Sequence, residues 1–187
     1  MVPLASLWLA ILLASVAVFF LSFLLRMVST HHLSDFDKLP DEDAVRDALR
    51  SAGVGEGQYA FPHCESFANM KSESFQKAWA EGPTGMMFVW PKGPWNMGKS
   101  LGQWFVMTLF VSAAVAWIAG LVIAPGAEWK TVAKVTGTIA FLSYGCAEIC
   151  GPIWKAGSWK VCFKELFDSA LYAFAVASVF IYFWPGA

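Results

Sequence analysis

Residues 93–100 read GPWNMGKS and fit the phosphate-loop pattern G-x-x-x-x-G-K-[ST], with Gly93, Lys99 and Ser100 at fixed positions. In that motif, backbone N–H groups between a strand and a helix cradle phosphates. Here the following segment, LGQWFVMTLFV, is apolar enough to enter a bilayer, and no apolar run ending in a carboxylate for Mg²⁺ occurs elsewhere. We therefore predict no bound nucleotide and interpret the pattern as the turn where the chain enters the membrane.

The residue types around this turn suit a membrane interface. Trp and Tyr concentrate at the headgroup level, and Lys residues mark the cytoplasmic edge. We predict that Trp90, Trp95, Lys99 and Trp104 anchor the chain at this interface.

A second group of residues could bind a transition metal or haem. His31 and His32 follow the first apolar segment, His63 and Cys64 are adjacent, and imidazole and thiolate are the usual ligands of Zn and Cu. Because adjacent side chains seldom point to the same ion, we expect the His31–His32 pair to supply one ligand. The alternative is that the pair forms a polar collar at the interface and that Cys64 is a small packing residue.

Glu148 and two cysteines lie within a predicted membrane segment. Glu148 is six residues from Trp154, hence roughly 9 Å inside the segment at 1.5 Å per residue. An ionisable group at that depth is a candidate for a proton or ion pathway, although pairing with a nearby Lys or with a partner subunit explains it as well. Cys146 and Cys150 share a helix face and are interpreted as packing residues.

The segments that must position these residues are mostly long runs without charged side chains. The chain is 57% hydrophobic and 14% charged, and there is no charge in residues 2–25, 100–127 or 169–187. Each run approaches or exceeds the roughly 20 apolar residues that cross a bilayer. Residues 131–154 form a further candidate that contains Lys134 and Glu148. We predict a helical membrane protein with four transmembrane helices: an anchor at 1–26 and a three-helix bundle at 100–187, with spans near 100–123, 131–154 and 166–185.

The segment 27–99 is predicted to be a small α/β domain between the first and second spans. Pro40 precedes acidic residues that favour a helix N-terminus. The stretches GQYAFP (57–62) and GMMFVWP (85–91) are aromatic and bounded by Gly and Pro, as strands are. SESFQKAWAEGP lies between them with helical spacing. The expected order is helix, strand, helix, strand.

The distribution of basic residues predicts the orientation. Lys130 and Lys134 lie on the side of the predicted termini. The other side carries a larger basic set near the membrane, namely Arg26, Lys38, Lys92, Lys99, Lys155, Lys160 and Lys164. The positive-inside rule therefore places 27–99 in the cytoplasm and both termini in the periplasm.

Small residues at four-residue spacing predict where the spans pack. Such stripes let helices approach closely in lipid. The predicted packing positions are Ala116, Gly120, Ala147, Gly151, Ser169, Ala173 and Ala177.

The stretches GPWNMGKSLGQWF, APGAEWKTVAKVTGTIAFLSYG and IWKAGSWKVCFKELFDSALYAFAVASVFIYFWP, together with the His pair, resemble a family of small bacterial membrane proteins with no established activity. The resemblance implies a location in the bacterial inner membrane. Cys146, Glu148 and Cys150 are not part of the shared pattern.

These observations favour a non-enzymatic accessory or scaffold subunit of a larger membrane complex, such as a respiratory or photosynthetic one. The sequence has no paired-carboxylate, Ser/His/Asp or cofactor motif, and four spans leave no room for a transporter's inverted repeats. The expected partners are the bilayer and other membrane subunits, with no nucleic acid. The alternatives are a metal- or haem-binding protein using His31 or His32, His63 and Cys64, and a proton pathway through Glu148.

Overall fold

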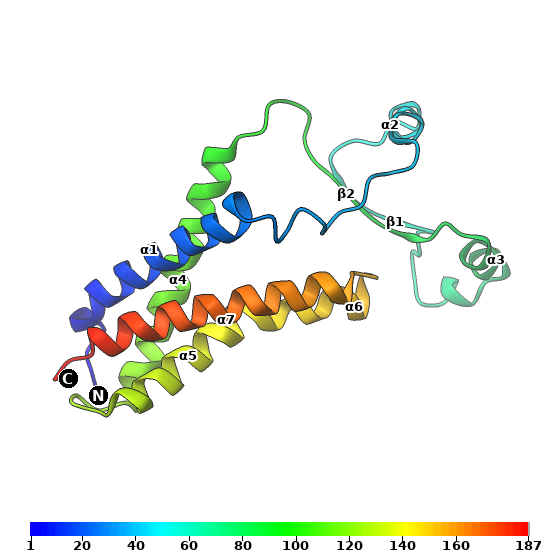
Figure 1. Cartoon of the computed structure of the whole chain (residues 1–187). Coiled ribbons are helices and arrows are strands. Elements are labelled where there is room, and N and C mark those ends of the chain that lie inside the picture. The colour runs from blue at the N-terminus through cyan, green and yellow to red at the C-terminus, as the bar shows by residue number, and fades with distance from the viewer. Residues whose placement is uncertain (187) are drawn as a thin grey trace. The chain divides into compact units, whose positions relative to one another are not determined.

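Three stretches of helix are long and apolar enough to cross a membrane: Leu4–Val28, Met97–Val122 and Trp159–Tyr182. The structure is a computed structural model, and it describes residues 1–186. The chain divides into two units, one made of Met1–Asp35 with the residues from Asn96 onward, and the other of Phe36–Trp95. The first unit is a helical bundle and the second is a small α/β domain (Figure 1).

The first membrane helix is continuous from a short 3-10 turn to a π-helical turn. Helix α1 (Trp8–Phe23) follows η1 (Leu4–Leu7) and is continued by η2 (Leu24–Val28), the π-helical segment. The inner face of α1 includes Ala10, Ala14 and Ser15, all of them buried. Because these side chains are small, α1 can pack closely on its neighbours, helices α4 and α7.

Helix α4 (Met97–Val122) begins within the GPWNMGKS stretch. Asn96 is its N-cap, and its side-chain oxygen accepts a hydrogen bond from the Lys99 backbone N–H at 3.0 Å. A phosphate loop would direct such N–H groups to phosphate, whereas here the Lys99 N–H binds the capping side chain. The pattern thus marks the start of an apolar helix, as the sequence indicated.

The prediction of one continuous helix over 131–154 is wrong. Helix α5 (Trp129–Gly145) ends at Gly145 and is followed by the 3-10 turn η4 (Cys146–Ile149) and the short α6 (Cys150–Trp154). Pro152 explains the break, because it has no N–H to donate to the carbonyl of Glu148 and its ring would clash there. In α6, Pro152 occupies the first turn, where no such bond is required.

Helix α7 (Trp159–Tyr182) packs along α5 through small residues. Ser169, Ala173 and Ala177 are buried, as predicted. The matching positions on α5 are Gly137, whose added Cβ would lie 3.5 Å from Ala177 Cβ, and Gly145. Of the packing positions predicted elsewhere, Ala116 and Gly120 are buried on α4, but Ala147 is exposed and Gly151 half-buried, since both lie beyond the end of α5.

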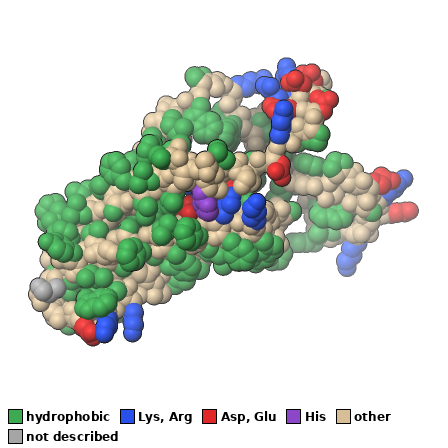
Figure 2. Space-filling model, viewed as in Figure 1, with side chains coloured by type: hydrophobic (Ala, Val, Ile, Leu, Met, Phe, Trp, Pro, Cys, Tyr) green, Lys and Arg blue, Asp and Glu red, His purple; other side chains and the backbone are tan. Residues whose placement is uncertain are grey.

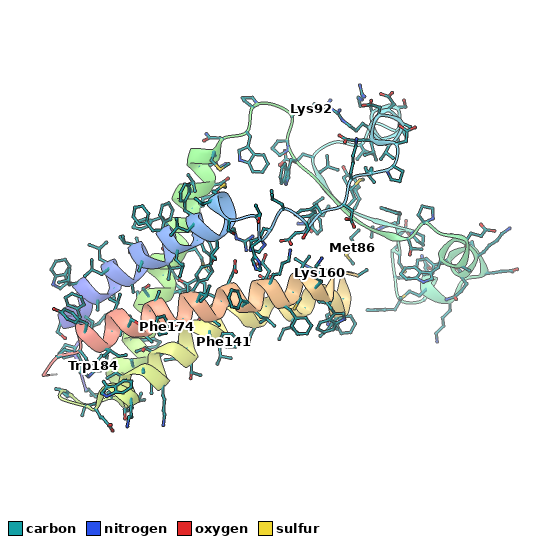
Figure 3. All side chains as sticks on the ribbon, viewed as in Figure 1. Met86, Lys92, Phe141, Lys160, Phe174 and Trp184 are labelled. Carbon is teal, nitrogen blue, oxygen red and sulfur yellow. The ribbon has the colours of Figure 1, made fainter. Side chains whose placement is uncertain are left out.

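The first and the last residues of the bundle lie close together, at one end of its helices. The Val2 N–H donates to Gly120 O at 2.8 Å, and the Gly126 N–H donates to Pro185 O at 2.8 Å. Trp184, labelled in Figure 3, donates from Nε1 to Ala124 O at 3.0 Å. The link between α4 and α5 is therefore tied to both the first and the last residues of the bundle.

The bundle surface is largely hydrophobic (Figure 2). Phe174, labelled on α7 in Figure 3, is 73% exposed, and Phe110 on α4 is 69% exposed. Large apolar side chains at this exposure are unfavourable in water and expected against lipid tails.

The Phe36–Trp95 unit has the predicted order of elements. It contains α2 (Glu42–Ser51), β1 (Gly57–Phe61), the 3-10 turn η3 (Asn69–Lys71), α3 (Glu73–Glu81) and β2 (Gly85–Val89). Asp41 and Ser72 cap the two helices by accepting bonds from Ala44 N and Phe75 N. The strands are antiparallel, with Tyr59 opposite Met87 and Phe61 opposite Gly85.

The close approach of α5 and α7 leads to the first prediction. A Cβ on Gly145 would lie 3.1 Å from Ser169 Cβ and 3.2 Å from Leu166 Cδ2. We expect Gly145→Leu to destabilise the bundle by about 1–3 kcal/mol through overpacking. The measurement is thermal unfolding of the purified protein in detergent. The control is Gly102→Leu, because Gly102 has no atom within 4 Å of its added Cβ, and equal melting temperatures for the two variants would contradict the packing.

Candidate functional site

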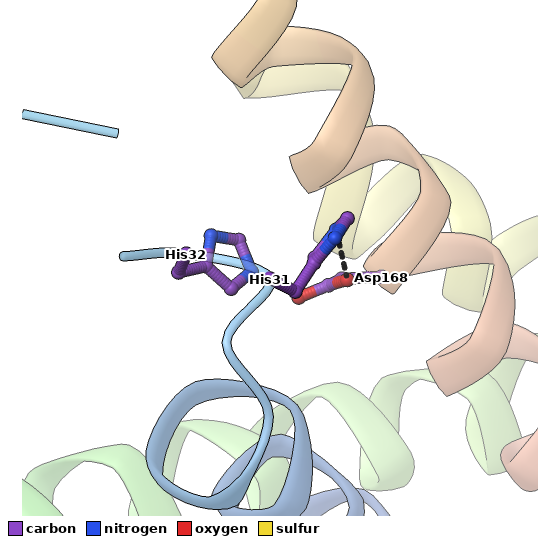
Figure 4. A group of neighbouring side chains, drawn as sticks. All are labelled: His31, His32 and Asp168. Carbon is purple, nitrogen blue, oxygen red and sulfur yellow. Dashed lines mark hydrogen bonds and ion pairs between the residues drawn. The ribbon is translucent and has the colours of Figure 1, made fainter. Parts of the chain in front are cut away.

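The segment that follows the first membrane helix turns back onto helix α7. Arg26, in the π-helical turn η2, forms an ion pair with Glu165 of α7. The chain then leaves the helix at Ser29, and residues 31–35 lie against Lys164 and Asp168. Figure 4 shows both imidazoles and Asp168 beside α7 at this point.

His32 lies between two carboxylates. Its Nδ1 is 2.5 Å from Asp35 Oδ2, and its Nε2 is 2.8 Å from Asp168 Oδ2. An imidazole that donates to carboxylates from both nitrogens carries two protons and a positive charge. The two contacts therefore favour the imidazolium form of His32.

Lys164 fixes the turn that carries the histidines. Its Nζ donates to His31 O at 2.7 Å, to Ser34 Oγ at 3.1 Å and to Asp35 Oδ1 at 2.6 Å. All three donor positions of the ammonium are used. Lys164 thus binds both the backbone and the side chains of the turn, and it orients Asp35 toward His32.

The cluster formed by Arg26, His31, His32, Asp35, Lys164, Glu165 and Asp168 is balanced in charge. Arg26, the His32 imidazolium and Lys164 face the three carboxylates of Glu165, Asp168 and Asp35. The side chains of Asp35 and Lys164 are 6% and 13% exposed. A buried charge without a partner is strongly unfavourable, so each member depends on its counterpart.

The hydrogen bonds within this cluster shift two pKa values. Burial lowers the pKa of His32, but hydrogen bonds to Asp35 and Asp168 outweigh it, and the pKa lies above its ordinary value. Burial raises the pKa of Asp35, but hydrogen bonds from Lys164 and His32 outweigh that effect and lower it. Both shifts favour the charged forms.

Two polar atoms of the cluster remain without hydrogen-bond partners. The Asp168 side chain is fully buried, and its Oδ1 has no partner among the residues the structure describes. His31 Nε2 is also buried without a partner and lies 3.7 Å from that oxygen. Buried polar atoms of this kind require a physical explanation.

A cavity of about 510 Å³ lies beside this cluster, between the ends of α1, α4, α5 and α7. Its walls are mainly apolar, but Arg26, Glu148 and Glu165 also line it. The hydroxyls of Tyr144 and Tyr172, two further lining residues, have no partner within residues 1–186. The cavity has the size of a small-molecule site.

The structure separates the residues predicted as metal ligands. His31 and His32 belong to the bundle unit, and their rings are 4.8 Å apart, so both reach Asp168. The expectation that the pair supplies a single ligand stays a prediction, although both rings lie within reach of the same carboxylate. His63 and Cys64 belong to the Phe36–Trp95 unit, where Cys64 Sγ donates to Ser66 O.

The other predicted site residues have varied positions. Glu148 lies in η4 and lines the cavity. In the described part of the chain, no Lys or Arg forms an ion pair with it. Lys164, one of the predicted partners, pairs with Asp35 instead. Trp104 packs against the bundle core, and its Nε1 donates to Ser22 Oγ at 2.8 Å. Trp90 and Trp95 are exposed and pack on each other. Their role as membrane anchors stays a prediction.

Sequence analysis missed Asp168, Lys164, Glu165 and Arg26 as site residues. A local signal was present: KELFD places Lys164, Glu165 and Asp168 within one helical turn at the start of an uncharged run. Charges at that position usually snorkel to the interface. Only the fold brings them to a segment more than 130 residues earlier in the chain.

Comparison with known proteins adds no further information. No protein-family model matches the sequence, and no curated protein or solved structure matches it. The function is therefore argued from the geometry of the chain itself.

The second prediction concerns Lys164. We expect Lys164→Met to destabilise the bundle by about 3–5 kcal/mol, because it leaves Asp35 buried without its ammonium partner. The readout is thermal unfolding in the same detergent at neutral pH. The control is Lys77→Met, which removes an exposed Lys77–Glu81 pair and should change stability little. Equal losses in the two variants would show that the contacts of Lys164 do not stabilise the fold.

Proposed function

We propose that this chain is a non-enzymatic accessory or scaffold subunit of a larger protein complex in the bacterial inner membrane. The observation that carries the proposal is the absence of a core in the Phe36–Trp95 unit. No side chain of that unit is buried, although it contains two helices and two strands. A two-stranded sheet without a packed face is marginally stable in water.

One face of the sheet presents an apolar stripe. In β2, Met86 and Phe88 are 53% and 56% exposed, and Trp90 directly after the strand is 66% exposed (Met86 is labelled in Figure 3). Their cross-strand neighbours are Ala60, opposite Met86, and Gln58, opposite Phe88. This face carries no charged side chain.

The chemistry of this stripe fits a protein partner. Aromatic residues and Met are enriched at the centres of protein interfaces, and charged residues are depleted there. Both outer strand edges are also unpaired in the two-stranded sheet, and an exposed edge can accept a strand from another chain. We therefore assign the stripe to a second membrane subunit.

The bundle supports four crossings of the membrane. Three helices are long enough to cross, and α5 has 17 residues, or roughly 26 Å at 1.5 Å per residue. The turn η4 and the short α6 follow it directly in sequence. Since the first and last residues of the bundle meet at one end, an even number of crossings accounts for their position. The basic residues then favour periplasmic termini and a cytoplasmic Phe36–Trp95 unit.

The third prediction tests the interface. We expect native mass spectrometry of the gently extracted protein to show a complex with a different membrane protein, and we expect Phe88→Asp to abolish that complex. Phe88 is exposed, so the change should alter unfolding free energy by only about 0.5 kcal/mol. The matched control is Arg46→Asp on α2, which should retain the complex.

Three results would count against this proposal. A lone monomer under every mild extraction would remove the accessory role. A complex of identical chains alone would replace it with self-association. A complex that Phe88→Asp leaves intact would show that the sheet does not form the interface.

The fourth prediction tests the orientation with Cys64. In a Cys146→Ser/Cys150→Ser background, we expect a membrane-impermeant maleimide to label Cys64 only after spheroplasts are permeabilised. The buried Cys162 can remain, and a Cys64→Ser variant gives the background signal. Lys130→Cys in the Cys64→Ser background should be labelled in intact spheroplasts. Labelling of Cys64 without permeabilisation would reverse the proposed topology.

A further inference from the structure

Three side chains of the bundle converge on one point with donor atoms that suit a metal ion. His31 and His32 each offer a ring nitrogen, Asp168 offers a carboxylate oxygen, and these atoms lie within 4.8 Å of one another. Figure 4 shows the three side chains together at the surface of α7. The two histidines come from the turn after the first membrane helix, and Asp168 comes from the last one.

The distribution of charges leaves Asp168 available. Arg26 is occupied by Glu165, and Lys164 is occupied by Asp35. Within residues 1–186, Asp168 pairs with no Lys or Arg, although its side chain is completely buried. Its Oδ1 has no hydrogen-bond partner in this described part of the chain. A buried carboxylate is stable only beside a compensating positive charge. Beside Asp168 that charge is the His32 proton, and a divalent cation between Asp168 and the imidazoles would replace it.

His31 supports the same conclusion independently. Its Nε2 is buried, has no partner and lies 3.7 Å from Asp168 Oδ1. Zn–N and Zn–O distances near 2.0–2.1 Å in a tetrahedron separate ligand atoms by about 3.3 Å. His31 Nε2 lies 3.7 Å from Asp168 Oδ1, and His32 Nε2 lies 2.8 Å from Asp168 Oδ2. Each imidazole nitrogen is thus close to that separation from one oxygen of the carboxylate.

The surroundings resemble the outer shell of a metal site. Metal-binding imidazoles commonly donate their other N–H to a carboxylate, which fixes the tautomer and the ring plane. His32 does this: Nδ1 lies 2.5 Å from Asp35 Oδ2, which leaves Nε2 directed at Asp168. Lys164 in turn holds Asp35. The His31 side chain is 33% exposed, so an ion can reach the site from that side.

We propose that His31, His32 and Asp168 bind a divalent transition-metal ion of the Zn²⁺ class, with Asp35 orienting His32. Two imidazoles and one carboxylate form a ligand set that Zn²⁺ and related ions accept, and water completes the coordination. The bound ion joins the turn after η2 to α7. This site is independent of the proposed protein partner, since the Phe36–Trp95 unit supplies none of its ligands.

The experiment uses the full-length chain without a histidine tag, purified in detergent and stripped with a chelator. Co²⁺ is titrated into the protein, and the visible absorption of tetrahedral Co²⁺ is recorded. Zn²⁺ then competes for the site, and elemental analysis after desalting gives the stoichiometry. We expect one ion per chain and displacement of Co²⁺ by Zn²⁺.

Single-residue variants distinguish the residues that bind the metal ion from residues that do not. His31→Ala removes a ring nitrogen that has no hydrogen-bond partner within residues 1–186, so it should abolish the Co²⁺ spectrum while leaving the melting temperature of the stripped protein almost unchanged. Asp35→Asn should weaken binding by about 10–100-fold, as expected for an outer-shell partner. His63→Ala and Cys64→Ser should bind like the unmodified chain.

Several outcomes would overturn the site. Less than one bound ion per chain at micromolar Co²⁺ or Zn²⁺ would show that the cluster is a network of ion pairs and not a metal site. Binding that survives His31→Ala would exclude the proposed ligand set. Binding lost with His63→Ala or Cys64→Ser would assign the ion to the other unit.

Discussion

The buried carboxylate of Asp168 is the constraint on which the bundle depends. Asp168 lies one residue before an uncharged run of 19 residues and has no access to solvent. Such a charge must be compensated from within the fold. Within residues 1–186, its ion-pair partners come from the turn after the first helix. Folding of α7 into the bundle and docking of that turn are therefore one event, and the Arg26–Glu165 and Lys164–Asp35 pairs hold the two segments in register.

The same constraint gives the arrangement of the helices a physical reason. Helix α1 must lie beside α7 for His32 to reach Asp168, and its small residues Ala10, Ala14 and Ser15 allow close approach. The α5–α7 contact uses Gly137 and Gly145 for the same purpose. In a bilayer, where lipid tails solvate apolar side chains as well as other helices do, such small residues and internal polar contacts decide which helices associate. Packing alone would leave α1 free to rotate, whereas the polar cluster fixes one face.

The sequence predicted what depends on local composition. Uncharged runs identified three apolar helices, and Gly and Pro delimited the elements of the Phe36–Trp95 unit to within one or two residues, because both effects act on neighbouring positions. Helix α5 was predicted too long, since hydropathy does not register the missing N–H of Pro152. The cluster escaped prediction for a different reason. His32 and Asp168 are separated by 136 positions, and their pairing depends on a helix arrangement that no local pattern encodes. The approach of both histidines to Asp168 was not predicted either, because it depends on the turns of residues 29–35 and on the position of α7.

The two units differ in how far their side chains find partners within the unit itself. In the bundle, the Arg, Lys and His groups of the cluster each have a partner or a candidate ion, and the apolar exterior matches lipid. The Phe36–Trp95 unit has capped helices and a paired sheet, so its backbone is organised, yet none of its side chains is buried. Hydrogen bonds and caps specify secondary structure but contribute little net stability without apolar burial. Burying Met86, Phe88 and Trp90, which lie exposed on an otherwise uncharged face, would therefore stabilise this unit. The bundle buries an apolar core, whereas the small unit buries none of its side chains, so it is there that the proposed partner subunit would contribute most to the fold.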